Sequence, residues 1–201
     1  MQMNSDHITK LRINNIVAKS DIVPPFSLSS LSAAFPFSIR HALSCIFLPY
    51  PIQHVNLSIF NTGSVISRSS RSVSDIEASF QWLRSFLASF DLELSSHYII
   101  LNIVASIELA LPMNLLALSS HLLNCSYDPS PMLSDDGHEH LVNCIAFYFH
   151  EARPHYTALI FPTGHVTFTG FKSTAELRAY VLKFSSLLSE IAQNHPEVLL
   201  K

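Results

Sequence analysis

The stretch Tyr156–Ser173, YTALIFPTGHVTFTGFKS, has the pattern of two short strands joined by a tight turn. Residues 156–161 are aromatic and aliphatic, and Pro-Thr-Gly-His at 162–165 supplies turn-forming residues. Beyond the turn, alternation predicts that Val166 and Phe168 lie on a buried face. The opposite face then carries His165, Thr167 and Thr169, whose side chains are polar enough to meet a binding partner.

A weaker copy of this stretch lies upstream at Leu57–Ser72, LSIFNTGSVISRSSRS. Aligning Phe60 with Phe161 also aligns the Thr-Gly pairs that follow them. A second repeated motif supports this alignment, because NIVA occurs at 15–18 and again at 102–105. Between these anchors the second copy carries about fourteen extra residues. We therefore interpret the chain as a tandem duplication.

The composition favours a large buried core. The chain has 201 residues, of which 48% are hydrophobic and only 13% charged. Such a composition argues against disorder. The formal net charge of −3 gives no overall attraction to a polyanion, so any nucleic-acid contact must come from a local surface.

The sequence predicts a soluble protein of a reducing compartment. Its three cysteines form no CxxC pair and no even disulfide set. The N-terminus lacks the apolar segment of a signal peptide, and the longest apolar stretch, 98–118, is interrupted by Asn102, Glu108 and Pro112. We expect a nuclear protein in a eukaryote and otherwise an intracellular one, in the host cell if viral.

Each copy reads as strand, helix, antiparallel strands and long helix. The expected domains are a flexible N-terminus at 1–10, a first repeat at 11–93, a second repeat at 98–192 and a C-terminal tail at 193–201. The expected strands are 12–22, 42–48, 55–67 (a hairpin), 98–109, 142–150 and 156–169 (a hairpin), and the expected helices are 27–35, 72–90, 112–123 and 174–192.

The two long helices are amphipathic. Ser74 followed by Glu77 has the spacing of a capping box at the start of the first. The apolar stripes expected to face the core are Ile76, Phe80, Leu83, Leu87 and Phe90 in the first helix and Leu177, Val181, Phe184, Leu188 and Ile191 in the second. Helices on one side leave the other face of the sheet uncovered, and a broad face with Phe and Val on it is an expected binding surface.

These sequence motifs resemble those of the TATA-box-binding protein family. The second copy carries LNIVASIEL at 101–109, SYDP at 126–129 and ARPHYTALIFPTGHVTFTGFKS at 152–173, against family patterns close to QNIV, SYEP and EPxxxALIFxSGKxVxTGAKS. The first copy shows NNIVA at 14–18 and SIFNTGSV at 58–65. The resemblance spans about residues 11–192 and is stronger in the second half.

The resemblance implies an α+β fold, a pseudo-symmetric saddle of two repeats with a curved antiparallel ten-stranded sheet and four helices on its convex side. The concave face would bind A/T-rich double-stranded DNA in the minor groove and bend it with Phe wedges. The implied DNA-binding residues are Asn15, Val17, Phe60, Ile66, Arg68, Arg71, Asn102, Val104, Leu159, Phe161, Thr167, Thr169 and Lys172. The two asparagines and Thr169 would be donors to groove acceptors, and Arg71 and Lys172 would contact phosphates.

The sequence departs from the family at the outer wedges. Seventeen residues before Phe60 and Phe161, where the family has another Phe, stand Leu43 and Cys144. Leu can wedge, whereas Cys is a poor substitute; a shifted register could bring in the rings of Phe47 and Phe147. Arg68 replaces a threonine, and Ser64 and His165 replace lysines, so the basic rim is thin.

The extra residues of the second copy form an acidic loop, PSPMLSDDGHEH at 129–140. The resemblance implies a protein contact there, with Asp128, Asp135, Asp136 and Glu139 facing transcription initiation factors. His138 and His140 lack the spaced partners of known metal sites, so we expect a solvated loop and neither a metal nor another cofactor. No nucleophile, phosphate-binding or metalloprotease motif is present, and we expect no enzymatic activity.

Two functions remain open. The first is a divergent TATA-box-binding-like transcription factor that binds and bends A/T-rich DNA and recruits initiation factors. The second is a protein-interaction scaffold of the same fold with weak or lost DNA binding. The duplicated asparagines and phenylalanines favour the first function, and the charge balance and Cys144 favour the second.

Overall fold

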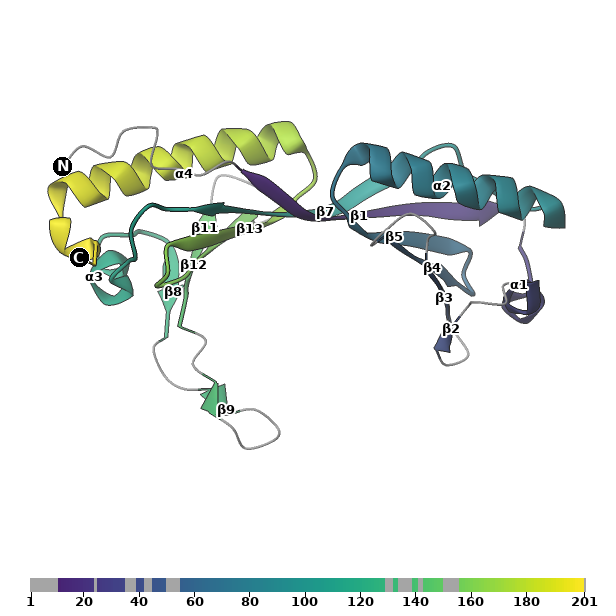
Figure 1. The fold of residues 1–201 in the computed structure, drawn as a ribbon, viewed down its shortest axis with the longest axis horizontal. Coiled ribbons are helices and arrows are strands. Elements are labelled where there is room, and N and C mark those ends of the chain that lie inside the picture. The colour runs from purple at the N-terminus through teal and green to yellow at the C-terminus, as the bar shows by residue number, and fades with distance from the viewer. Residues whose placement is uncertain are drawn as a thin grey trace. The chain divides into compact units, whose positions relative to one another are not determined.

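The computed structural model describes residues 11–23, 25–34, 39–41, 45–49, 55–128, 132–133, 139–140, 143–149 and 156–200. The chain forms two compact units, one built on residues 13–103 and one on residues 104–201. We call them the first and second units and describe each by itself (Figure 1).

The sheet of the first unit is antiparallel. Its strands are β1 (Arg12–Val23), β2 (Ile39–His41), β3 (Cys45–Pro49), β4 (Asn56–Phe60) and β5 (Ser64–Ser70), in the spatial order β2-β3-β4-β5-β1. The short β6 (Glu93–Leu94) pairs with the end of β1. The helices are α1 (Leu28–Ala34), α2 (Val73–Leu87) and the 3-10 turn η2 (Ala88–Phe90).

The second unit repeats this plan. Strand β7 (Ile99–Glu108) leads into it, followed by β8 (Cys125–Tyr127), β11 (Ile145–Phe149), β12 (Tyr156–Ile160) and β13 (His165–Phe171), in the spatial order β7-β13-β12-β11-β8. Strands β9 (Met132–Leu133) and β10 (Glu139–His140) pair separately. The helices are α3 (Leu115–Ser119), α4 (Thr174–Asn194) and the 3-10 turn η3 (Pro196–Val198).

The core of the first unit lies between α2 and one face of its sheet. The α2 side chains Ile76, Phe80, Leu83 and Leu87 are fully buried, as the amphipathic pattern predicted. The sheet contributes Ile16, Ala18, Ile46, Leu57, Ile59 and Val65, also buried. Since burial of an aliphatic or aromatic side chain contributes about 1.5–3 kcal/mol, these residues dominate the stability of the unit.

The core of the second unit has the same arrangement, with α4 running along its sheet (Figure 1). All five residues of the predicted α4 stripe are buried. The ring of Phe184 lies 5.6 Å from that of Phe168 on β13 and 5.4 Å from that of Phe147 on β11. The predicted fold class, α+β with four helices and ten antiparallel strands in two repeats, is confirmed for the described residues, where β6, β9 and β10 are additional short strands.

Three local predictions were wrong. The capping box of α2 is Ser72 with Asp75, not Ser74 with Glu77: the Ser72 hydroxyl accepts from the Asp75 N–H (3.1 Å), and the Asp75 carboxylate accepts from the Ser72 N–H (3.1 Å). Phe90 is 41% exposed, because α2 gives way to η2 before it. The helix expected at 112–123 is shorter and spans only α3 (Leu115–Ser119). It begins late because Met113 pairs with Leu199 and Asn114 is the N-cap.

The observed capping box predicts the effect of one substitution. Ser72→Ala removes the acceptor for the Asp75 N–H and should lower the free energy of unfolding by about 1 kcal/mol. Ser74→Ala is the matched control, because within the described contacts the Ser74 hydroxyl lies 2.8 Å from the Ser72 hydroxyl and caps no backbone N–H of the helix. Urea denaturation followed by circular dichroism measures both variants, and an equal loss would show that the box contributes nothing.

None of the helices within the described residues combines the length and the apolar composition that crossing a membrane requires.

Candidate nucleic-acid interface

The open face of the first unit's sheet begins on β1. Asn15, Val17 and Lys19 are half-buried there, whereas Ile16 and Ala18 between them point into the core. This alternation is the one that the sequence predicted. The cross-strand register places Ile66 of β5 opposite Lys19, and Ile66 is likewise half-buried. Asn15, Val17 and Ile66 therefore lie on the face that α2 leaves uncovered.

A bulge between β1 and β5 orients the Asn15 side chain. The register shifts between Ile16 and Ala18, and Ser69 adopts a positive φ of 65°. The Ser69 backbone N–H then donates to Asn15 Oδ1 at 2.8 Å. Because the amide oxygen is engaged, the Asn15 NH₂ group is the part left to donate hydrogen bonds from this face.

The aromatic residues of this face come from β3 and β4. Phe60, the last residue of β4, is half-buried, and it lies opposite Cys45 in the register. Phe47 is also half-buried, opposite Ser58. Leu43, the residue at the expected outer wedge position, lies outside the described residues. Phe47 and Phe60 thus place two half-buried rings on the described part of this sheet face.

The open face of the second unit's sheet matches the sequence prediction. His165, Thr167 and Thr169 of β13 are half-buried, and Val166 and Phe168 are fully buried. Across the register, Leu159 lies opposite Thr167 and is half-buried as well. Phe161 follows β12 with the same alternation and is half-buried, its ring 6.1 Å from the imidazole of His165.

Strand β7 carries Asn102, the asparagine of the second NIVA motif. Asn102 and Val104 are half-buried, and Ile103 and Ala105 are fully buried, as the alternation predicted. Gly170, which aligns with Ser69 of the first copy, also has a positive φ, of 96°. The backbone conformation that orients Asn15 in the first copy therefore recurs in the second.

Phe147 does not supply the missing wedge. It is only 8% exposed and packs at 5.0 Å from Phe149 and 5.4 Å from Phe184, on the core face. The neighbouring Tyr148 was missed: it is 37% exposed and lies opposite Thr157 on the open face. Strict alternation along IAFYF at 145–149 was the signal that could have identified it.

Cys144 precedes β11 by one residue. The register pairs Ile145 with Ile160, and extending it by one places Cys144 opposite Phe161. Burial raises the pKa of the Cys144 thiol, so the side chain is a neutral thiol at physiological pH. Cys144 is half-buried and too small to act as a wedge beside Phe161.

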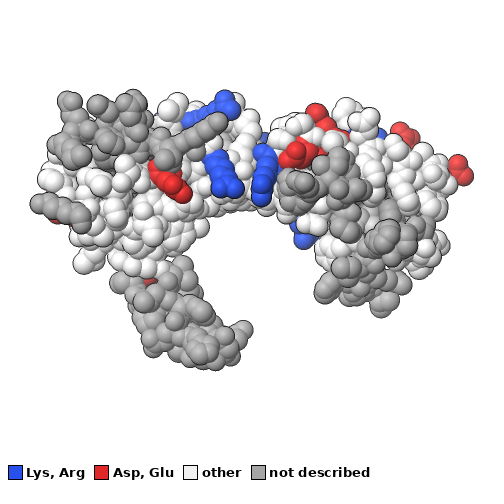
Figure 2. Space-filling view, in the orientation of Figure 1, with Lys and Arg blue, Asp and Glu red and all other residues white. Residues whose placement is uncertain are grey.

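Positive charge on these faces is sparse. Arg71 and Lys172, the two residues expected to contact phosphates, are exposed at the hairpin ends, and Arg68 is exposed as well. Lys19 adds a cation that was not predicted as a site residue, but its Nζ lies 3.4 Å from Asp21 Oδ1. Figure 2 shows few basic side chains among the described residues of the face in view, most of which is uncharged.

The acidic residues expected to meet a protein partner are only partly described. Asp128 is exposed directly after β8, and Glu139 begins β10. Asp135 and Asp136 lie outside the described residues. The role of this loop stays a prediction.

Each unit thus presents an uncovered antiparallel sheet face carrying small, apolar and amide side chains. This arrangement defines a class of protein that binds a partner on a sheet. It lacks the clustered acids, bases and nucleophiles of a catalytic site among the described side chains of these faces.

Comparisons with known proteins find similarity to TATA-box-binding proteins. A model of the family "Transcription factor TFIID (or TATA-binding protein, TBP)" matches residues 97–191. A TATA-box-binding protein of Thermococcus celer is 28% identical over 168 residues, which are 82% of each chain. The solved structure of Methanococcus jannaschii TBP superposes with a TM-score of 0.73 at 19% identity, covering 90% of this chain and 99% of that chain.

Together these findings agree with the family that the sequence motifs predicted: the family model matches the second repeat, and the two relatives are similar to most of the chain. The family is one of DNA-binding transcription factors and not of enzymes.

Proposed function

We propose that the protein binds A/T-rich double-stranded DNA in the minor groove through the open faces of its sheets, bends it, and recruits transcription initiation factors. The observation that carries this proposal is the orientation of Asn15. Its amide oxygen accepts the Ser69 N–H at 2.8 Å, so its NH₂ group is the hydrogen-bonding group presented by that face. In the minor groove, A·T pairs offer acceptors only.

The neighbours of the asparagines also suit an A·T groove floor. Val17 lies two residues after the first asparagine and Val104 two residues after the second, and Ile66 lies opposite Lys19 on the same face as Val17. All three are half-buried and uncharged. Small apolar groups can approach the floor of an A·T groove, which has no protruding amino group. Phe60 is the last residue of β4 and Phe161 directly follows β12, each beside a tight turn, where a ring could enter a base step.

The sparse positive charge supports the second candidate function, a protein-interaction scaffold. Lys19 is paired with Asp21, and the chain carries a net charge of −3. Affinity that depends on phosphate contacts falls steeply with salt, so few such contacts leave little non-specific binding. Under this alternative the open faces bind protein.

A binding and bending experiment separates the two functions. Wild-type protein should shift a TATA duplex at low salt and bend it, which fluorescence energy transfer between dyes on the two DNA ends would measure. Phe161→Ala should reduce the bending by more than half and the affinity by about tenfold, because a wedge stabilises the kinked duplex.

Phe90→Ala is the matched control, since Phe90 is an exposed ring on η2, outside the sheets. It should change neither binding nor bending. Folded wild-type protein that gives no shift at micromolar concentration would overturn the proposal in favour of the scaffold. Equal losses of bending and non-specific binding in Phe161→Ala would instead assign Phe161 to the core.

A further inference from the structure

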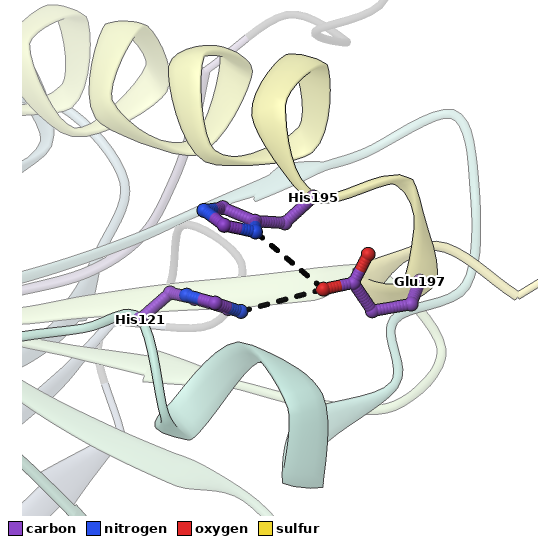
Figure 3. Close-up of side chains that lie close together, drawn as sticks. All are labelled: His121, His195 and Glu197. Atoms are coloured by element: carbon purple, nitrogen blue, oxygen red, sulfur yellow. Dashed lines mark ion pairs between the residues drawn. The ribbon is translucent and has the colours of Figure 1, made fainter.

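Three side chains that could hold a metal ion meet at the C-terminal end of the second unit (Figure 3). His121 follows α3, His195 ends α4, and Glu197 lies in η3. The backbone holds these segments together: the Asn114 N–H donates to the Val198 carbonyl at 2.8 Å, and the Leu200 N–H donates to the Pro112 carbonyl at 3.0 Å. The cluster therefore rests on a fixed backbone frame.

The distances fit a tetrahedral ion. His121 Nε2 and His195 Nδ1 each lie 3.5 Å from Glu197 Oε1, and all three ligand atoms lie within 4.8 Å of one another. Ligands bound to zinc at about 2.0–2.1 Å with tetrahedral geometry are separated by about 3.3 Å. The spacing of the ligand atoms therefore suits the ion, and binding requires the two stacked imidazole rings to rotate until the nitrogen lone pairs, which lie in the ring planes, converge on it.

The same geometry gives little stability as an ion-pair cluster alone. The two imidazole rings stack with centroids 3.6 Å apart and an interplanar angle of 19°, so protonating both would place two like charges face to face. The Glu197 side chain is 57% exposed, and ion pairs of exposed side chains contribute little to stability. Neutral imidazoles beside a carboxylate are, by contrast, a common ligand set for zinc.

The Glu197 carboxylate is ready to act as a ligand. A hydrogen bond from its own backbone N–H lowers the pKa of Glu197, and the neighbouring imidazoles lower it further, against an opposing contribution from desolvation. The geometry places this carboxylate beside both imidazole rings, with Glu197 Oε1 3.5 Å from His121 Nε2 and 3.5 Å from His195 Nδ1.

We propose that His121, His195 and Glu197 form a binding site for Zn²⁺ or a similar divalent metal that prefers imidazole. The ion takes three protein ligands and leaves its fourth position to water. The ligands come from the residues after α3, from the end of α4 and from η3. The bound metal therefore links the C-terminal segment to the end of α3. Its effect is on stability, and it does not depend on DNA binding.

The test uses the full chain, freed of metal by a chelator and titrated with Zn²⁺ and separately with Co²⁺. Zn²⁺ should raise the melting temperature by several degrees, because a ligand that binds only the folded state stabilises it. Co²⁺ should give visible d–d absorption that saturates at one equivalent for this site. Both readouts are independent of DNA.

The variants locate the site. His121→Gln with His195→Gln should abolish the melting shift and the absorption, and Glu197→Gln should weaken metal binding by at least about tenfold. The control is His138→Gln with His140→Gln, in the acidic loop, which should retain both signals. The proposal is overturned if wild-type protein binds no Zn²⁺, if the His121/His195 variant binds it as tightly as wild type, or if only the loop variant loses it.

Discussion

Asn15→Asp is expected to lower the affinity for a TATA duplex by about 100-fold without changing the melting temperature. The substitution keeps the shape of the side chain. It also keeps an oxygen that can accept the Ser69 N–H, which donates to Asn15 Oδ1 at 2.8 Å in the wild-type protein. It removes the NH₂ donor and places a negative charge among groove acceptors. A lost specific contact costs about 1–3 kcal/mol, and about 1.4 kcal/mol corresponds to a tenfold change in affinity.

The measurement is fluorescence anisotropy with a labelled TATA duplex, at one fixed low salt concentration. Gln81→Glu is the matched control, because it adds the same charge on the exposed side of α2 and should change affinity less than about threefold. Equal weakening by the two variants would mean that only net charge matters. Unchanged binding by Asn15→Asp would show that the open face of the first unit does not contact the DNA.

The parts of the interface predicted correctly from sequence are those governed by strand alternation. Strand alternation assigned Asn15 and Val17 to one face of β1 and Ile16 to the other, and the burial of these residues in the structure alternates in the same way. The same rule placed Thr167 and Thr169 on the open face of β13. Alternation is a local property of the backbone, so it can be read from a single sequence.

Features that depend on distant pairing were not predictable. Strand β8 has only three residues and is defined by its pairing with β11, about twenty residues later. The helix expected from Pro112 is shortened because Met113 pairs with Leu199 near the other end of the chain. The contact from Ser69 to Asn15 and the meeting of His121 with His195 likewise join residues that no local pattern connects.

Gly164→Ala is expected to lower the free energy of unfolding by about 3–4 kcal/mol. Gly164 has a φ of +85°, and a Cβ there would lie 2.7 Å from the Leu111 carbonyl oxygen and 3.1 Å from the Leu109 carbonyl oxygen. The left-handed conformation alone costs a non-glycine residue about 1–2 kcal/mol. The clash with backbone adds to this cost, because backbone cannot rotate away as a flexible side chain does.

Gly63→Ala, at the equivalent turn of the first copy, is the matched control for the clash. Gly63 has nearly the same φ, +89°, but its Cβ would meet only the Ile22 carbonyl oxygen, at 3.1 Å. We therefore expect a smaller loss there, about 1–2 kcal/mol from the conformation plus a small shift of the Ile22 carbonyl, because no contact comparable to the one of 2.7 Å is made. Urea denaturation followed by circular dichroism measures both losses. Equal losses would show that the turn at Gly164 moves away from Leu111, and that the close approach of the hairpin to the end of β7 adds no cost of its own.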